Sequence, residues 1–174
     1  MVEVKIVAPQ TRAATEGDNE GTTVEVTGDV YVTVKHSGGD WTQKVAAASG
    51  EQTVKFYGVT SPSKVEVSMN GGKASYTFDE LVAAQSTVTY TLKNAFGAAA
   101  VPATETETFN MQAVNTVPVY GEATPSLTGT IEEAPNAKQY QMYRATVYLK
   151  IPVARLEVSI DRGEVASTQF SALT

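Results

Sequence analysis

The sequence predicts an all-β protein folded as an antiparallel β-sandwich, and three observations lead to this prediction. The chain contains 23 Val and 23 Thr against only 6 Leu and 4 Ile, and β-branched residues suit the pleated, half-buried surface of a strand. Several segments alternate apolar and polar residues with a period of two. Turn signals rich in Gly, Asn and Asp separate these segments. About ten short strands divided in this way are typical of a β-sandwich.

The first part of the chain predicts five strands. The cleanest alternation places Val65, Val67 and Met69 on one face of a strand and charged or hydroxyl side chains on the other. Residues 8–22 form a polar loop, and the Gly28-Asp29 pair predicts a bulge or a turn. The five predicted strands are Val2–Val7, residues 24–35, Trp41–Ala47, Gln52–Tyr57 and Lys64–Met69.

The middle of the chain predicts a turn, one short helix and a strand. Asn70-Gly71-Gly72 is a strong turn signal and precedes residues 74–78. Residues 77–85 (TFDELVAAQ) predict a short helix with Thr77 or Asp79 as its N-cap. Thr87–Leu92 alternates as a strand. Residues 95–108 are expected to form an exposed loop, because Gly97 and Pro102 would break an Ala-rich helix.

The last part contains an unusually long run of strand-forming residues. Residues 109–114 predict a strand, and residues 117–123 (VPVYGEA) are expected to be a fixed connection. Residues 143–151 and 153–160 each alternate cleanly. Pro152 lies between them and cannot donate to a ladder, so the two halves are expected to meet at a bend or a sheet edge.

Length and charge limit the classes of function. A chain of 174 residues suits one domain, or two small ones, and we treat residues 1–174 as a single domain. The net charge of −6 would repel phosphate backbones, so no nucleic-acid partner is expected. No run of about 18 apolar residues predicts a membrane helix. No signal peptide follows Met1, so the protein is either cytosolic or has its targeting segment upstream.

The sequence offers no convincing catalytic or metal-binding constellation. The absence of Cys excludes disulfides and thiol chemistry. His36 is the one histidine and lies in a turn, which suits neither a catalytic dyad nor a zinc site. Residues 18–20 (Asp-Asn-Glu) do not have the spacing of a calcium loop. We therefore expect no enzyme activity, no metal and no cofactor.

Paired carboxylates and aromatic rings are further candidates for catalytic and sugar-binding residues. Glu132 and Glu133 are adjacent and would point to opposite faces of a strand, whereas Glu105 and Glu107 could share a face. Both pairs are interpreted as surface charge. The aromatic residues could form a platform that stacks on sugars, or they could cover the core and the sheet edges. These residues are Trp41, Phe56, Tyr57, Tyr76, Tyr90, Tyr140, Tyr143 and Tyr148.

Several short motifs resemble the fimbrillin family of Bacteroides-type bacteria. The loop VPVYGEA at residues 117–123 and the segment YRATVYLKIPVARLEVSI at residues 143–160 carry the resemblance, with VARLEV at 153–158 as the best match. IVAPQTRA at residues 6–13 resembles the first strand of such proteins and the Thr-Arg-Ala segment after it. FYGVTSPSKVEVSMN at residues 56–70 resembles their strand–turn–strand unit. The resemblance extends over residues 2–160.

The resemblance implies a transthyretin-like, Greek-key sandwich that is the N-terminal domain of an exported lipoprotein. The lipid anchor would lie upstream of Met1, and the protein would be at the outer membrane in a fimbria. In such proteins an Arg-directed protease removes the first strand, and a strand from the next subunit takes its place. Carried over, Arg12 is the candidate processing site, and Val2, Val4, Ile6 and Val7 belong to the displaceable strand.

The chain departs from the family pattern at two places. Lys150 and Pro152 interrupt a segment that is usually apolar throughout, and the sequence stops at QFSALT, where a full-length fimbrillin would continue into a second domain. The chain is therefore expected to be either an N-terminal domain fragment or a shortened relative. The leading hypothesis is a non-catalytic fimbrial subunit or accessory component whose partners are other fimbrial subunits. A host surface protein or glycan is a further expected partner. The alternative is a surface glycan-binding or adhesin module, and an enzyme is the third hypothesis.

Overall fold

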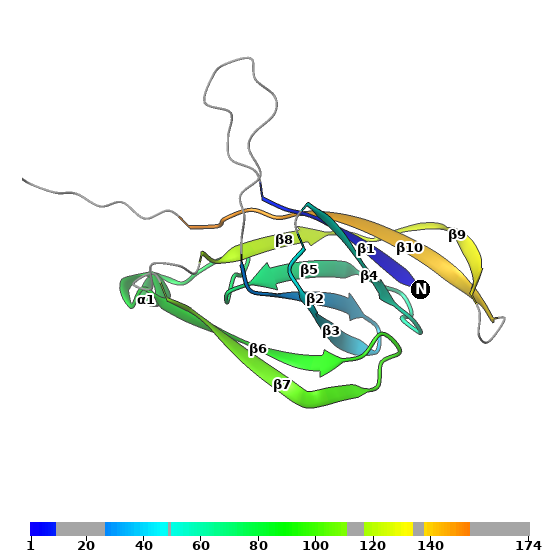
Figure 1. Cartoon of the computed structure of the whole chain (residues 1–174), viewed down its shortest axis with the longest axis horizontal. Coiled ribbons are helices and arrows are strands. Elements are labelled where there is room, and N and C mark those ends of the chain that lie inside the picture. Colours follow the sequence, from blue (N-terminus) through cyan, green and yellow to red (C-terminus); the bar gives the residue numbers. More distant parts are fainter. Residues whose placement is uncertain (10–26, 49, 111–116, 134–137, 154–174) are drawn as a thin grey trace, which may run out of the picture.

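The computed structural model describes residues 1–9, 27–48, 50–110, 117–133 and 138–153 as a set of strands with one short helix (Figure 1). The described residues form two sheets, with the strand orders β4-β1-β10-β9 and β7-β6-β3-β2-β5-β8. The predicted all-β sandwich with one short helix is thereby confirmed. The elements are β1 (Val2–Val7), β2 (Asp29–His36), β3 (Gly39–Ala46), β4 (Glu51–Phe56), β5 (Lys64–Met69), α1 (Phe78–Val82), β6 (Gln85–Lys93), β7 (Ala99–Asn110), β8 (Val119–Ala123), β9 (Ser126–Glu133) and β10 (Lys138–Tyr148).

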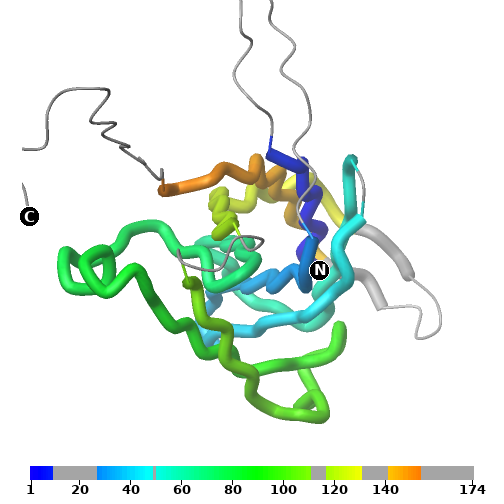
Figure 2. The backbone as a smooth tube through the Cα atoms, turned by 60° about the vertical axis from the view of Figure 1, so that its left-hand side comes forward, coloured from blue at the N-terminus to red at the C-terminus, as the bar shows by residue number. Residues whose placement is uncertain are grey.

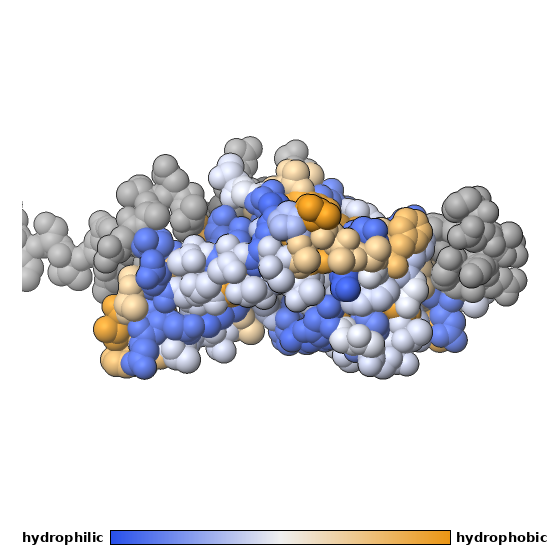
Figure 3. Space-filling view, turned by 90° about the horizontal axis from the view of Figure 1, so that it is seen from below, coloured by the Kyte–Doolittle hydropathy of each residue, from blue (hydrophilic) through white to orange (hydrophobic). Residues whose placement is uncertain are grey.

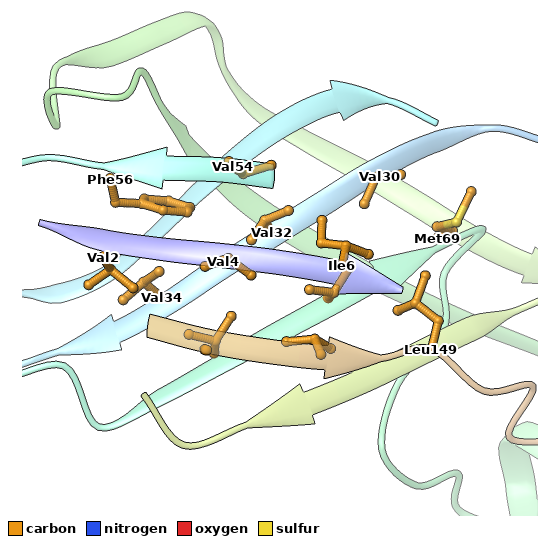
Figure 4. Packing of buried hydrophobic residues seen from close by; sticks show 14 of the residues in the cluster. Val2, Val4, Ile6, Val30, Val32, Val34, Val54, Phe56, Met69 and Leu149 are labelled. Atoms are coloured by element: carbon orange, nitrogen blue, oxygen red, sulfur yellow. The ribbon is translucent and has the colours of Figure 1, made fainter. Parts of the chain in front are cut away.

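The main core lies between the two sheets and consists largely of valine. Alternate residues of β1, β2 and β5 turn inward, which is the period-two pattern that the sequence predicted. Figure 4 shows β1 lying across β2 with the inward side chains of both strands packed between them. The core contains Val2, Val4, Ile6, Val30, Val32, Val34, Val54, Phe56, Val59, Val65, Val67, Met69, Val119, Ala145, Val147 and Leu149.

The β6–β7 hairpin adds a third layer to the sandwich. It lies on the face of β2, β3 and β5 that points away from β1 and β10 (Figure 1). In the described residues β6 joins β3 through the single pair Thr42–Leu92. The Tyr31 ring of β2 stacks on the Tyr90 ring of β6, with ring centroids 4.2 Å apart. The six-stranded sheet therefore folds back over its own outer face.

Two pairings depart from the antiparallel pattern. β1 runs parallel to β10 over six residue pairs, and β6 meets β3 in a parallel bridge. A two-residue hairpin can join only antiparallel strands, whereas parallel neighbours need a long connection. Most of the chain lies between β1 and β10, so the connection between them is long enough for a parallel pair. The other strand pairs of the described sheets are antiparallel.

The predicted helix is confirmed, and Thr77 is its N-cap. The Thr77 hydroxyl accepts a hydrogen bond from the Glu80 backbone N–H at 3.3 Å, and the Thr77 N–H donates to the Glu80 carboxylate at 2.8 Å. This capping box satisfies two backbone donors at the start of the helix. The helix buries none of its residues. Its stability therefore comes from its caps and the Lys73–Glu80 ion pair and not from a packed face.

Two predicted loops are strands in the structure. Residues 95–108 were expected to be an exposed loop, but residues 99–110 form β7, which pairs with β6. Residues 117–123 were expected to be a fixed connection, but residues 119–123 form β8, which pairs with β5. The loop prediction relied on Gly97 and Pro102, and an edge strand tolerates a proline. β9 was not expected, and β10 begins five residues before the predicted strand at Tyr143.

The long run of strand-forming residues changes sheet after β10. Lys150 and Tyr120 exchange two backbone hydrogen bonds of 2.9 Å, which places Lys150 at the outer edge of β8. Continuing this antiparallel register would set Pro152 opposite Pro118, and neither residue has an N–H to donate. The pairing with β8 therefore does not continue past Pro152, which agrees with the expectation of a bend or a sheet edge at this residue. The second half of the predicted strand was residues 153–160, of which Val153 is described and lies in no strand. Residues 154–160 lie outside the described residues, as do residues 24–26 and 111–114.

Candidate functional site

The predicted displaceable strand lies inside its sheet and not at an edge. β1 pairs in parallel with β10 from Val2–Tyr143 to Val7–Tyr148. It pairs in the antiparallel direction with β4 from Val2–Phe56 to Val7–Glu51. Figure 2 shows β1, in blue, beside the orange β10. The N-terminal strand therefore has a neighbour on both sides along its whole length.

Three of the four predicted residues of this strand face the core. Val2 and Val4 are fully buried and Ile6 is 4% exposed, and all three point towards the valines of β2 (Figure 4). Val7 is half-buried on the other face. The pattern follows from the alternation of side chains along a strand. Residues 2, 4 and 6 are thus the side chains that β1 contributes to the core between the two sheets.

Backbone hydrogen bonds extend the ladder beyond both ends of β1. The Tyr143 N–H donates to the Met1 carbonyl at 2.9 Å, and the Leu149 N–H donates to the Val7 carbonyl at 3.0 Å. The amino group of Met1 donates to the Gln141 carbonyl at 2.6 Å. These contacts fix the parallel register between β1 and β10.

The outer face of β1 carries two ion pairs, one to each neighbouring strand. Arg144 Nε of β10 lies 3.0 Å from the Glu3 carboxylate, and Lys5 Nζ lies 2.8 Å from the Glu51 carboxylate of β4. Exposed pairs of this kind contribute little to stability. Their positions match opposite charges across the strand pairs, which favours the observed register over a shifted one.

The surroundings of β1 would form an apolar groove if this strand left. The walls would be Val54 and Phe56 of β4 and Ala145 and Val147 of β10, all of which are buried. Both walls would also present the backbone groups that now pair with β1. Chemically, such a groove accepts one extended chain with apolar side chains at alternate positions.

The candidate processing site and the acidic loop belong to the segment between β1 and β2. Arg12 and residues 18–20 lie outside the described residues. β1 and β2 are the described strands on either side of this segment. The assignment of Arg12 therefore stays a prediction.

His36 ends β2 in a turn, as predicted. Its Nδ1 accepts a hydrogen bond from the Gly38 N–H at 3.0 Å, and its ring meets the edge of the Trp41 ring with centroids 4.9 Å apart. The acceptor role assigns the ring proton to Nε2. Nε2 is buried and has no hydrogen-bond partner among the described residues. The ring therefore packs against Trp41 and does not present a catalytic dyad.

Glu105 and Glu107 share one face of β7, as the sequence allowed, and both are half-buried. The Glu105 carboxylate accepts a 2.6 Å hydrogen bond from the Tyr31 hydroxyl and pairs with Lys44 at 2.9 Å. The Glu107 carboxylate accepts a 2.9 Å hydrogen bond from the Gly71 N–H. The expectation that these two residues lie in a loop was therefore wrong, because they belong to β7 and their carboxylates bind groups of β2, β3 and the turn after β5.

These contacts shift the titration of the groups involved. The hydrogen bond from Tyr31, with the Lys44 ammonium, holds the pKa of Glu105 below its usual range. Burial raises the pKa of Glu107. Burial also raises the pKa of Tyr90 to about 12, and the pKa of Tyr31 is raised by burial and by its hydrogen bond to Glu105. Burial thus opposes the ionisation of both tyrosines and of Glu107, whereas the partners of Glu105 favour its carboxylate form.

One pattern in the sequence does indicate this polar layer. Thr and Glu alternate strictly over residues 104–108, which is the period of a strand even though no apolar residue takes part. The pairing of Thr87, Thr89 and Thr91 with Thr108, Thr106 and Thr104 follows from the matching alternation in residues 87–91. Tyr31 as the partner of Glu105 could not have been found, because 74 positions separate them.

The eight aromatic candidates do not form one platform. Phe56 and Tyr90 are buried, and Tyr148 is 70% exposed on β10. Trp41, Tyr57, Tyr76 and Tyr143 are half-buried, and the side chain of Tyr140 is outside the described set. Phe96, which was not among the candidates, is 68% exposed and stacks on Tyr57 with centroids 5.0 Å apart. This pair is the exposed aromatic stack at the β6–β7 turn.

The remaining site predictions concern carboxylate pairs, metals and membranes. Glu132 and Glu133 are the last residues of β9, and their side chains are outside the described set. Among the described residues, no group of three or more potential ligands could hold a metal ion. No helix in the described ranges has the length and apolar character needed to cross a membrane.

Comparisons with known proteins found little. No family model matches the chain, and no curated protein matches it. Among solved structures, the chain resembles a "putative cell adhesion protein" from Bacteroides eggerthii, with 16% sequence identity and a TM-score of 0.39. The match covers 85% of this chain and spans 39% of the length of that protein.

Proposed function

We propose that this chain is a non-catalytic structural protein of the cell surface, a fimbrial subunit or accessory component that assembles by β-strand exchange at the position of β1. The observation that carries the proposal is the place of β1 in the fold. It is a complete strand at the N-terminus, it is paired on both sides, and it fills the core with Val2, Val4 and Ile6.

A strand in this position suits assembly for an energetic reason. Its departure opens a groove with apolar walls and two unpaired edges, which is a costly state that an incoming strand would relieve. The incoming strand would recover the hydrogen bonds and the buried apolar area together. Its release would require many ladder bonds to break at once, so the joined subunits would separate slowly.

The partners in this proposal are other fimbrial subunits, each of which supplies a strand to the groove of its neighbour. Attachment to the outer membrane would come from a lipid anchor upstream of Met1, and a host surface protein or glycan would be a further partner. No nucleic acid takes part, because the net charge of −6 repels phosphate backbones. No enzyme activity or cofactor is included.

Controlled cleavage tests the proposal. Digestion with an Arg-specific protease, followed by gel electrophoresis without boiling, should give a ladder of oligomers that do not depend on disulfides. The matched control is Arg12→Gln, which should stay monomeric under the same digestion. A labelled peptide with the sequence of residues 1–8 should compete for the groove, and its Val4→Asp version should not. Absence of a ladder and of peptide uptake after complete cleavage would count against the proposal.

A surface glycan-binding module is the second candidate function, and one observation favours it. The exposed Tyr57–Phe96 stack offers a ring face of the kind on which sugars stack. Trp41 packs under this turn, since a Cβ added at Gly97 would lie 2.3 Å from its ring. Titration with oligosaccharides should therefore change the Trp41 fluorescence, and Phe96→Ala should abolish the change. A flat response removes this candidate.

A further inference from the structure

The β6–β7 hairpin carries an exposed hydrophobic group at each of its ends. At one end, α1 exposes Phe78 (79%), Leu81 (46%) and Val82 (68%), which we call the α1 patch. At the other end, the β6–β7 turn exposes Phe96 (68%) over Tyr57, which we call the tip patch. Figure 1 places α1 and this turn at opposite ends of the hairpin. Figure 3 shows hydrophobic residues at the α1 end and again towards the opposite end of this face.

Polar contacts fix the backbone of the α1 patch although the helix buries none of its residues. Its three residues follow the i, i+3, i+4 spacing that places side chains on one side of a helix. The capping box of Thr77 and Glu80 fixes the start of this helix. Glu80 also pairs with Lys73 and accepts a hydrogen bond from the Ser86 hydroxyl at 3.1 Å. Because the backbone of the patch is already ordered, less conformational freedom is lost on binding, which favours association.

The charged residues beside the two patches are complementary. Asp79 lies in the first turn of α1, and Lys93 is the last residue of β6 before the tip. Within the part of the chain that the structure describes, neither side chain takes part in an ion pair. Contact between two α1 patches would bring Asp79 against its own copy, and contact between two tips would do the same for Lys93. Contact between an α1 patch and a tip patch would bring opposite charges together.

We propose that the α1 patch of one copy docks on the tip patch of the next copy. The two surfaces are different and lie at opposite ends of one element, so the contact is heterologous and continues as an open row of subunits. The inference rests on the proposed function in one respect. Each patch contains only a few residues, whereas stable complexes bury about 800 Å² on each partner. The contact is therefore weak alone and gains strength where strand exchange holds the subunits together.

Disulfide trapping detects such a weak contact directly. The native chain has no cysteine, so the chain with Ala83→Cys at the end of α1 and Ala98→Cys at the tip has no background reaction. Both positions are exposed, and they lie at opposite ends of the hairpin, so the bonds form between copies. Mild oxidation of the intact protein should give a ladder that a reducing agent removes. The matched control, Ala83→Cys with Thr89→Cys in the middle of the exposed β6 face, should give several-fold less.

Two further variants test the chemistry of the contact. Phe78→Ser in the trapping chain should reduce the ladder several-fold. Asp79→Lys should reduce it as well, and adding Lys93→Asp should restore it, because the charges are then exchanged and still opposite. Circular dichroism of each variant confirms that it is folded. A ladder no stronger than the Thr89→Cys control, or one that neither Phe78→Ser nor Asp79→Lys weakens, would overturn the inference.

The two proposals fail separately in these experiments. The trapping ladder forms without protease and is removed by reduction, whereas the strand-exchange ladder needs cleavage and survives reduction. A reducible ladder with no protease-dependent ladder would leave the docking contact standing and remove strand exchange. The opposite result would remove the docking contact alone.

Discussion

The Tyr31 hydroxyl donates a 2.6 Å hydrogen bond to the Glu105 carboxylate and so joins the central sheet to the β6–β7 hairpin across 74 positions of sequence. The Tyr31 ring also stacks on Tyr90, whose hydroxyl shares a 2.6 Å hydrogen bond with the Ser68 hydroxyl. The hairpin has little backbone pairing to β3. These side-chain contacts therefore hold the third layer in place.

Tyr90→Phe is expected to lower the free energy of unfolding by about 0.5–1.5 kcal/mol, the net value of a hydrogen bond in a protein. The ring and its stacking on Tyr31 remain, while the buried Ser68 hydroxyl loses its partner. Urea unfolding measures the difference. The control is Tyr148→Phe, because Tyr148 is 70% exposed and its hydroxyl faces solvent. An equal effect of the two variants would contradict the assigned role of Tyr90.

Glu80→Gln is expected to remove part of the acid sensitivity of the protein. The Lys73 ammonium, followed by the Thr77 backbone N–H, lowers the pKa of Glu80 from 4.5 to about 2. A carboxyl group whose pKa is lower in the folded state stabilises the protein above the unfolded pKa. This contribution is present above pH 4.5 and is lost as the pH falls towards 2. The midpoint temperature of thermal unfolding should therefore fall less steeply with decreasing pH in Glu80→Gln than in the native chain.

Glu107 provides a control of opposite sign. Burial raises its pKa above 4.5, so its contribution to stability is most favourable at low pH and declines as the pH rises through the folded pKa. Glu107→Gln should remove that decline while keeping an oxygen to accept from the Gly71 N–H. If both glutamine variants shifted the pH dependence in the same direction, the assignment of the two environments would be wrong.

Gly72→Ala is expected to be strongly destabilising because β8 passes directly over this glycine. An added Cβ would lie 2.1 Å from the Val119 carbonyl oxygen and 2.7 Å from the Val119 nitrogen. These are backbone atoms of a paired strand, so they cannot move without disturbing the pairing of β8 with β5. Gly50→Ala is the control, since its Cβ meets nothing within 4 Å and only its positive φ of 84° opposes alanine. That strain costs about 1–2 kcal/mol. Urea unfolding should show a clearly larger loss for Gly72→Ala.

The period of two predicted the strands whose inward residues are apolar. Val2–Val7 and Lys64–Met69 begin and end at the predicted residues, because each buries every second side chain in the main core. The rule failed where polar residues face inward. β7 turns Glu105 and Glu107 towards Tyr31 and Gly71, and a hydrophobicity pattern carries no signal for such a strand. The partners of these two carboxylates follow only from the way the hairpin folds back over the central sheet.

The candidate site was predictable in part. The alternation of Val2, Val4 and Ile6 predicted that they share a face, and the structure buries all three. The parallel pairing with β10 was not predictable, because strand order depends on contacts between residues more than 130 positions apart, such as Val2 and Tyr143. The tip patch was missed for a similar reason, since Phe96 meets Tyr57 only after β4 and β6 are placed.

Val4→Ala is expected to weaken β1 without changing its pairing. Val4 is fully buried at the middle of the strand, and removal of two methyl groups from a packed core costs about 2 kcal/mol. The variant should unfold at lower urea concentration, and after cleavage it should release β1 faster, because less apolar area holds the strand. Lys5→Ala is the matched control, since the adjacent Lys5 is exposed and its pair with Glu51 lies at the surface. Hydrogen exchange of the β1 amides measures release directly. Equal exchange rates in Val4→Ala and Lys5→Ala would show that core packing does not limit the departure of β1, and strand exchange at this groove would then need another barrier.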